Sequence, residues 1–196
     1  MPSSDLPSPT VPVPEGWRVA SDELTTPFDV RVVSVRAHTV VLADDALRER
    51  VEERVEANAD ADADATWRFF FASRLRLAPA APPSRAMTRI VANRANAGFA
   101  DTLRERGFDA VRAADSRRWS VREETADLTR YEARVAVGDV CVDVEAYFAV
   151  WSDGSDFLAA GGAYPRAVAS GPDAVAACFE PERFREELFE MIRATR

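Results

Sequence analysis

The sequence contains no lysine and no glutamine, one histidine and two cysteines, and all 25 of its basic residues are therefore arginine. His38 cannot form a usual zinc site alone, because such sites need several His or Cys ligands. Cys141 and Cys178 are widely separated, which fits neither a zinc-binding spacing nor a disulfide framework, so we expect two reduced thiols. The sequence thus predicts no metal ion and no cofactor.

Long apolar runs and catalytic motifs are missing as well. No run approaches the length of a membrane helix, and the first residues, MPSSDLPSPTVPVPEG, have neither the basic start nor the apolar segment of a signal peptide. We therefore expect a cytoplasmic protein with no membrane partner. No nucleophile-elbow motif accompanies His38, so a serine-hydrolase triad is not indicated.

Acidic residues, by contrast, are abundant. The chain has 33 Asp and Glu and a formal net charge of -8, which argues against duplex nucleic acid as a partner. Residues 85–122 are the exception, with nine arginines and four acids. Arginine forks suit phosphate or carboxylate groups. An anion- or RNA-binding surface at Arg85, Arg89 and Arg94 is one reading of this segment, and pairing with the acidic remainder of the chain is the other.

The stretch from Leu128 to Pro165 predicts three antiparallel strands joined by two tight turns. Gly138-Asp139 and Asp153-Gly154 are the two-residue turn candidates. Because side chains alternate along a strand, one face of this meander is almost wholly apolar and must be covered. That valine-rich face includes Val142, Val144 and Phe148, and the opposite, mixed face combines charges with aromatic rings.

The flanking segments complete an α+β fold. We expect strands over residues 28–42 (one strand or a pair), 67–77 and 108–122 (one strand or two). Apolar stripes predict helices over 45–57 and 84–106 and from Pro181 onward. Residues 1–15 hold five prolines and predict a disordered tail. Residues 16–196 predict a single α+β domain, an antiparallel sheet with a C-terminal β-meander packed by helices over the valine-rich face.

The mixed face is the first candidate site. The predicted register places Glu132 opposite Glu145, Arg134 opposite Asp143, and Gly162 across from Glu145. Two close carboxylates can share a proton or hold a cation, whereas the alternative is a solvated acidic surface. An exposed aromatic patch beside the pair would mark a binding site for a protein partner or small ligand. The candidate residues are Glu132, Asp143, Glu145, Tyr147, Trp151 and Tyr164.

A resemblance adds to this interpretation. Residues 85–165, above all VEAY at 144–147 and WSDGSDFLAAGGAYP at 151–165, resemble an uncharacterised haloarchaeal family whose members often carry a lipoprotein signal not evident here. The lysine-free, acidic composition is similar to that of proteins from salt-loving archaea. The meander followed by a C-terminal helix is similar to the Mog1/PsbP-like sandwich, which implies a sheet packed by helices.

Neither resemblance supplies catalytic residues. We therefore interpret the chain as a non-enzymatic module that binds a protein partner or a small ligand. The alternative from another class is a hydrolase-like enzyme that uses Glu132, Asp143 and Glu145 as its acids and bases.

Overall fold

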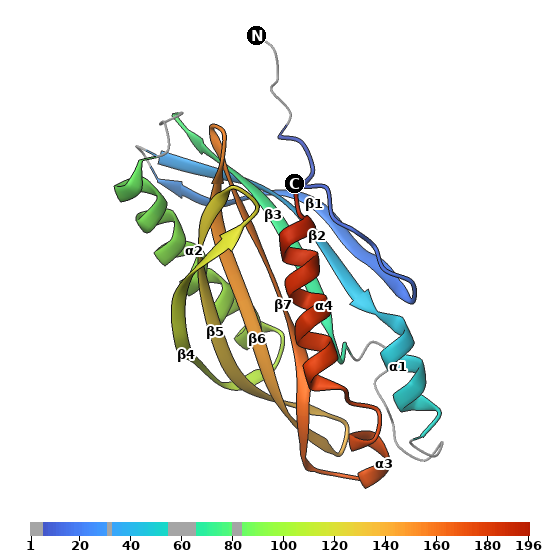
Figure 1. Cartoon of the computed structure of the whole chain (residues 1–196). Helices are drawn as coiled ribbons and strands as arrows, with labels where there is room; N and C mark the ends of the chain where they lie inside the picture. The colour runs from blue at the N-terminus through green and yellow to red at the C-terminus, as the bar shows by residue number, and fades with distance from the viewer. Residues whose placement is uncertain (1–5, 31–32, 55–65, 80–83) are drawn as a thin grey trace.

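The structure is a computed structural model that describes residues 6–30, 33–54, 66–79 and 84–196. Strands and helices alternate early in the chain, and a later run of four strands is followed by two helices (Figure 1). The strands are β1 (Trp17–Val30), β2 (Val33–Asp44), β3 (Phe69–Ala78), β4 (Phe108–Val121), β5 (Glu124–Val137), β6 (Val140–Asp153) and β7 (Asp156–Ser170). The helices are α1 (Asp45–Glu52), α2 (Arg85–Glu105), α3 (Asp173–Ala176) and α4 (Pro181–Ala194).

All seven strands form one antiparallel sheet in the order β1-β2-β3-β7-β6-β5-β4. The predicted α+β class is confirmed. The expected segment 28–42 is a strand pair whose first member begins earlier, at Trp17. The expected segment 108–122 is one strand, β4, with two shifts in its register against β5.

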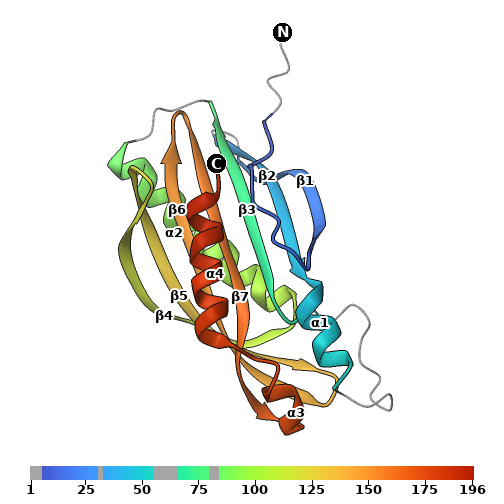
Figure 2. The same ribbon diagram turned by 45° about the vertical axis from the view of Figure 1, so that its right-hand side comes forward.

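The two long helices lie on opposite faces of the sheet (Figures 1 and 2). Helix α2 covers the valine-rich face over β4 and β6, where Phe99 stacks on Phe148 at 5.0 Å between ring centroids. Helix α4 packs on β7 and β3 from the other side. The sequence placed the helices over the valine-rich face, but the mixed face is covered too, because α4 has a strongly apolar stripe of its own that must be buried. This stripe consists of Phe184, Leu188, Met191 and Ile192.

Local signals define the two ends of α2 and the start of α4, at the positions that the sequence predicted. The Ser84 side chain accepts a hydrogen bond from the Met87 backbone N–H, which caps the first turn of α2. Gly107 follows that helix with a φ of 85°, a conformation that favours glycine. Pro181 occupies the first turn of α4, where its missing N–H costs no helical hydrogen bond.

The two hairpins of the meander differ in how well the sequence places them. The first is confirmed, with Val137 paired to Val140 around Gly138. The second turn is centred on Gly154-Ser155, and Asp153 pairs with Asp156. The reason is that two-residue hairpin turns of the favoured types need a positive φ at their first central residue, and Gly154 supplies 61° there. The predicted register of β7 is therefore wrong by two residues, and Tyr164, not Gly162, lies opposite Glu145.

The proline-rich N-terminal segment also departs from the sequence prediction. Residues 1–5 lie outside the described part of the chain, but residues 6–16, which we call the strap, pack on the protein. Leu6 is 2% exposed, and Thr10 and Arg196 exchange two backbone hydrogen bonds of 2.7 and 3.0 Å. His38 on β2 contacts the Leu6 carbonyl oxygen through Nδ1 at 2.9 Å. Prolines fit such a strap because it needs few backbone donors.

Candidate functional site

The aromatic residues of the mixed face are buried. Tyr147, Trp151 and Tyr164 are 7%, 2% and 1% exposed. The Tyr147 ring meets the Phe189 ring edge-on at 4.8 Å, and the Tyr164 ring lies 6.4 Å from that of Phe184, so both contact residues of α4. These rings therefore do not form the exposed aromatic patch that would mark a binding site on this face.

The carboxylates of this face form a chain of ion pairs with arginines. Glu132 lies opposite Glu145, as predicted, but Arg130 donates from Nη1 to both, at 3.1 and 2.8 Å. Tyr164 donates its hydroxyl hydrogen to the second Glu145 oxygen, and Arg112 pairs with Glu132. Burial and the hydrogen bond to Glu145 raise the pKa of Tyr164 far above its usual range, which keeps the phenol protonated as a donor.

The outer pair of the same face is also formed. Arg134 donates from Nε to Asp143 at 2.8 Å. Each of the three candidate carboxylates, Glu132, Asp143 and Glu145, thus has an arginine partner, and Glu145 is 9% exposed. Carboxylates neutralised by arginine beside rings covered by a helix are typical of a surface with a structural role. This geometry favours neither a hydrolase-like enzyme nor ligand binding at Glu145.

Two of the three arginines predicted as an anion site, Arg89 and Arg94, do not converge. Arg89 and Arg94 are exposed residues of α2, and the side chain of Arg85 lies outside what the structure describes. Five residues along an α-helix turn the chain by about 140° beyond a full turn. Arg89 and Arg94 therefore project from different sides of α2, and the helix does not place them on one ligand.

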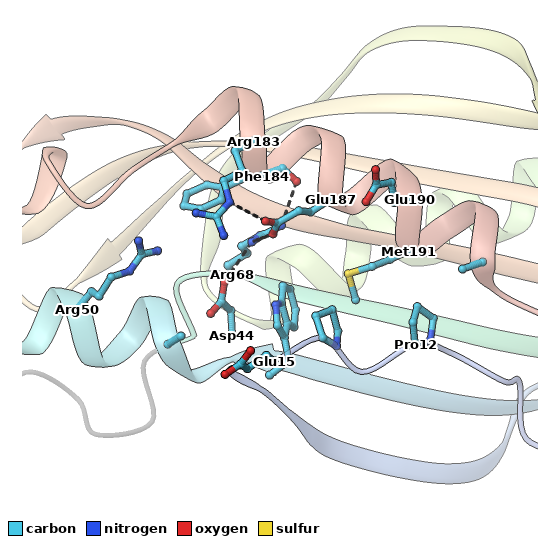
Figure 3. A pocket seen from close by; sticks show the side chains of 14 residues that line it. Pro12, Glu15, Asp44, Arg50, Arg68, Arg183, Phe184, Glu187, Glu190 and Met191 are labelled. Carbon is cyan, nitrogen blue, oxygen red and sulfur yellow. Dashed lines mark hydrogen bonds and ion pairs between the residues drawn. The ribbon is translucent and has the colours of Figure 1, made fainter.

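One cavity of the structure was not predicted from the sequence. It measures about 640 Å³ and lies between the strap, α1 and α4 (Figure 3). Arg68, 3% exposed, is its central charge and bonds Asp44, Glu187 and the carbonyl oxygen of Phe184 at 2.8–3.1 Å. The guanidinium carbon also lies 4.5 Å from the centre of the Phe184 ring. We call this cavity the Arg68 cleft.

The partners of Arg68 explain why the cleft is structural. Asp44 is also the N-cap of α1, because its other oxygen accepts from the Leu47 N–H. Burial alone would raise the pKa of Glu187, but the hydrogen bonds and charges of Arg68 and Arg183 lower it below its ordinary value. Arg68 thereby joins β2, α1 and α4, and a ligand would have to displace these bonds. A single arginine ahead of a strand gives no sequence signal for such a role.

The second cavity, which we call the α2 groove, has a different chemistry. It measures about 270 Å³ and lies where α2 leaves part of β2 and β3 uncovered. Its floor and walls are mostly aliphatic and aromatic. The lining residues are Thr25, Ala37, Thr39, Val41, Phe69, Phe71, Ser73, Leu75, Ala95, Gly98, Phe99, Thr102, Arg106, Phe148 and Ala159.

The polar groups of the α2 groove are few. Thr39 and Ser73 bond each other through their hydroxyls at 2.7 Å, which satisfies both on the groove floor. Arg106 is the single charged residue of the lining and lies at its rim, with its guanidinium carbon 5.3 Å from the centre of the Phe69 ring. Within the described residues, Arg106 forms no ion pair with a carboxylate. The groove thus combines apolar walls with one exposed positive charge.

Gly98 is the opening in the helical wall of this groove. Helix α2 runs unbroken through this residue, from Arg85 to Glu105. A Cβ added at Gly98 would meet no atom within 4 Å. Neither close packing nor a left-handed conformation therefore requires glycine here, although glycine destabilises a helix interior. The missing side chain widens the groove.

Other features of the described residues concern metals and membranes. They contain no cluster of three or more His, Cys, Asp and Glu side chains placed to hold a metal ion. None of the helices in the described ranges combines the length and the apolar character needed to cross a membrane. Cys141 and Cys178 are both free thiols.

This architecture defines a class of α+β protein in which one seven-stranded antiparallel sheet carries a long helix on each face. By sequence the chain belongs to the family described as a domain of unknown function, DUF6517, whose match spans residues 7–196. The match includes nearly the whole strap. Neither the curated proteins nor the solved structures contain a significant match to the chain.

Proposed function

We propose that this protein is a non-enzymatic binding module whose α2 groove takes a small amphipathic molecule with an aliphatic chain and an anionic head. The observation that supports this most is the lining, in which an apolar surface carries one charge, Arg106, and no carboxylate. Ligand sites in proteins are typically apolar clefts with a few placed polar groups. The groove volume of about 270 Å³ suits a short chain.

The chain of the ligand lies along Phe71 and Leu75, where Gly98 leaves the helical wall open. Its head lies at Arg106, near the C-terminal end of α2. Arginine presents several N–H donors in a planar fork, which suits carboxylate and phosphate heads alike. A cationic head is disfavoured by the same guanidinium.

The experiment is a calorimetric titration with straight-chain carboxylates of increasing length at fixed salt. Each added methylene contributes about 0.8 kcal/mol when buried, which is about fourfold in affinity. We expect that gain at each step until the groove is full. A matched alcohol should bind more weakly, and an amine weaker still. Affinities that do not change with chain length would contradict the proposal.

Two variants locate the binding on the protein. Gly98→Leu fills the groove and should abolish binding, whereas the control Ala97→Leu adds a leucine side chain at a neighbouring exposed position of α2 outside the lining. Arg106→Gln should weaken the carboxylates but not the alcohols. If Gly98→Leu binds as well as the unmodified protein, the ligand lies elsewhere.

The composition and the fold support two wider proposals, one about setting and one about fold likeness. The acidic, lysine-free chain supports work at high salt in the cytoplasm of a salt-loving archaeon. The helices on both sides of the sheet support the likeness to the Mog1/PsbP sandwich. A protein partner in place of a small ligand remains the second reading of a binding module.

A further inference from the structure

Two strand irregularities meet at one end of the sheet. On β4, the register against β5 shifts between Asp109 and Arg112, and Ala110 between them has a φ of 52°. Across the sheet, β6 pairs Asp143 with Ala167 and Val144 with Pro165, so Arg166 of β7 has no register partner. Bulges of this kind bend a strand and redirect its side chains, and they are enriched beside functional sites.

A pocket of about 260 Å³ lies between these irregularities. We call it the bulge pocket, and it shares no residue with the α2 groove. Four neighbouring strands contribute to it. Its lining residues are Ala110, Arg112, Glu132, Ala133, Arg134, Asp143, Val144 and Arg166.

The charges of the bulge pocket have the opposite balance to those of the chain. Three arginines face two carboxylates, whereas the whole chain carries -8. Arg112 pairs with Glu132 and Arg134 with Asp143. Within the described residues Arg166 forms no ion pair, and it is exposed. One guanidinium of the pocket is therefore left for an outside anion.

The paired arginines can contribute as well. The side chains of Arg112 and Arg134 are 67% and 60% exposed, so each can turn toward the pocket without losing buried contacts. Surface ion pairs of this exposure are weak. A bound oxyanion that accepts from Arg166 can compete with Glu132 and Asp143 for the guanidinium groups of Arg112 and Arg134. It can do so because forked contacts to an oxyanion are strong hydrogen bonds.

Ala110 gives a second reason to regard this rim as functional. Left-handed backbone is uncommon for residues other than glycine and is found disproportionately at binding and catalytic sites. Here it places Ala110 and Arg112 on the same pocket rim, opposite the unpaired Arg166.

We propose that the bulge pocket binds a small oxyanion with the geometry of a phosphate group, and that Arg166 is the arginine that holds it. The anion lies between Arg112, Arg134 and Arg166, with the two carboxylates limiting the pocket to a single small group. Free phosphate and the phosphate of a monoester present the same chemistry. This site does not depend on a ligand in the α2 groove.

The test is a titration of the full chain, followed through the arginine Nε–H signals in NMR spectra at constant ionic strength. The probes are inorganic phosphate and, separately, glycerol phosphate. We expect saturable shifts at Arg112, Arg134 and Arg166. Tighter binding of glycerol phosphate identifies a monoester ligand, and tighter binding of inorganic phosphate identifies the free ion. Shifts that grow linearly without saturation for both probes would overturn the proposal.

Arg166→Gln should lower the phosphate affinity about tenfold, since it removes one charge-assisted contact. Arg118→Gln is the matched control, because it removes one charge from an exposed β4 residue outside the pocket. Equal losses in both variants would show general charge attraction and overturn the assignment. Arg166→Lys keeps the charge without the fork, and an intermediate affinity is expected.

Discussion

Glu145 shows how burial changes the meaning of a charged residue. Its side chain is 12% exposed and accepts from Arg130 and Tyr164. Removing this acceptor leaves the buried Tyr164 hydroxyl without its partner. We expect Glu145→Ala to lower the free energy of unfolding by about 1–3 kcal/mol. Urea unfolding measures this loss.

Glu132 is the matched control for that substitution. It lies directly opposite Glu145 and is bound by two arginines, but its side chain is 28% exposed. Because exposed ion pairs contribute about 0–1 kcal/mol, Glu132→Ala should cost less than Glu145→Ala. Equal losses would mean that the buried tyrosine hydrogen bond contributes nothing.

The contacts of His38 imply that the stability of the strap depends on pH. Its Nδ1 faces the Leu6 carbonyl oxygen and its Nε2 faces Asp22, so both nitrogens must donate, which requires the imidazolium form. The hydrogen bond to the Leu6 carbonyl oxygen raises the pKa of His38 above 6.5, although desolvation opposes this shift. The hydrogen bond to Asp22 and the negative charge of Asp22 raise the pKa further. Its stabilisation is then complete below about pH 6.5 and is lost as the pH rises through the folded-state pKa.

An NMR titration of the His38 ring checks this assignment. The folded-state pKa should lie above 6.5, and Asp22→Asn should lower it. Signals of Leu6 should shift in the same pH range, since its carbonyl accepts from the ring. A His38 pKa at or below the ordinary value would refute the strap contact as described.

At the scale of single residues, the sequence predicts pairs within the meander and misses contacts that cross elements. Glu132–Glu145 and Arg134–Asp143 follow from one tight turn and strand alternation. Tyr164 was placed wrongly because the second turn was predicted one residue too early. A shift of one residue in a turn changes the cross-strand partner of each residue by two positions. Arg68 could not be recognised, because its partners lie far along the chain, Asp44 at the end of β2 and Glu187 on α4.

At the scale of elements, substitutions at Gly98 in α2 should affect stability and ligand binding differently. Gly98 lies inside the helix with open space around it. Gly98→Ala should therefore raise the free energy of unfolding by about 0.5–1 kcal/mol through helix propensity. Thermal melting measures the gain. A loss of stability would show that the position is more crowded than the structure indicates.

The central strand β6 carries the strictest packing prediction. Val144 is 4% exposed, which confirms that it faces the core as the alternation predicted. Val144→Asp places a carboxylate among the apolar side chains of the core, where it loses its hydration at a large cost in free energy. The variant should fail to fold, as judged by the absence of dispersed NMR signals. A folded Val144→Asp protein would contradict this packing.

Element types were readable where periodicity was strong and where caps were explicit, as in α2, α4 and the meander. The strap was not readable, because its prolines predict disorder and its order depends on one buried leucine and on bonds to Arg196, at the far end of the chain. The early part of β1 was missed as well, since its polar residues give little alternation.

The whole molecule is asymmetric across its sheet. On one face α4 packs over β7 and β3 and the strap is bonded to Arg196 just beyond it, whereas on the other face α2 lies over β4 and β6 and leaves part of β2 and β3 uncovered (Figure 2). The uncovered part contains the floor of the α2 groove. No local pattern in the sequence specifies how far a helix lies from a sheet edge, so the groove could not be predicted without the structure.

Net charge acts on the whole molecule through salt. With a charge of -8, mutual repulsion of carboxylates opposes folding, and salt screens it over a Debye length of about 10 Å at 0.1 M. Screening also weakens the surface ion pairs, but these contribute little individually. We expect the melting temperature to rise as KCl is increased from low to molar concentrations. A midpoint that stays constant or falls would show that the ion pairs outweigh the repulsion.

Charge variants make this expectation specific. Glu182 and Glu186 are exposed on α4, one helical turn apart, and neither forms an ion pair with a described residue. Like charges at this spacing repel, so replacing both with glutamine should raise the melting temperature at low salt and flatten its dependence on KCl. Arg118→Gln changes the net charge in the other direction and should steepen the same dependence. If both variants give the slope of the unmodified protein, salt acts through something other than net charge.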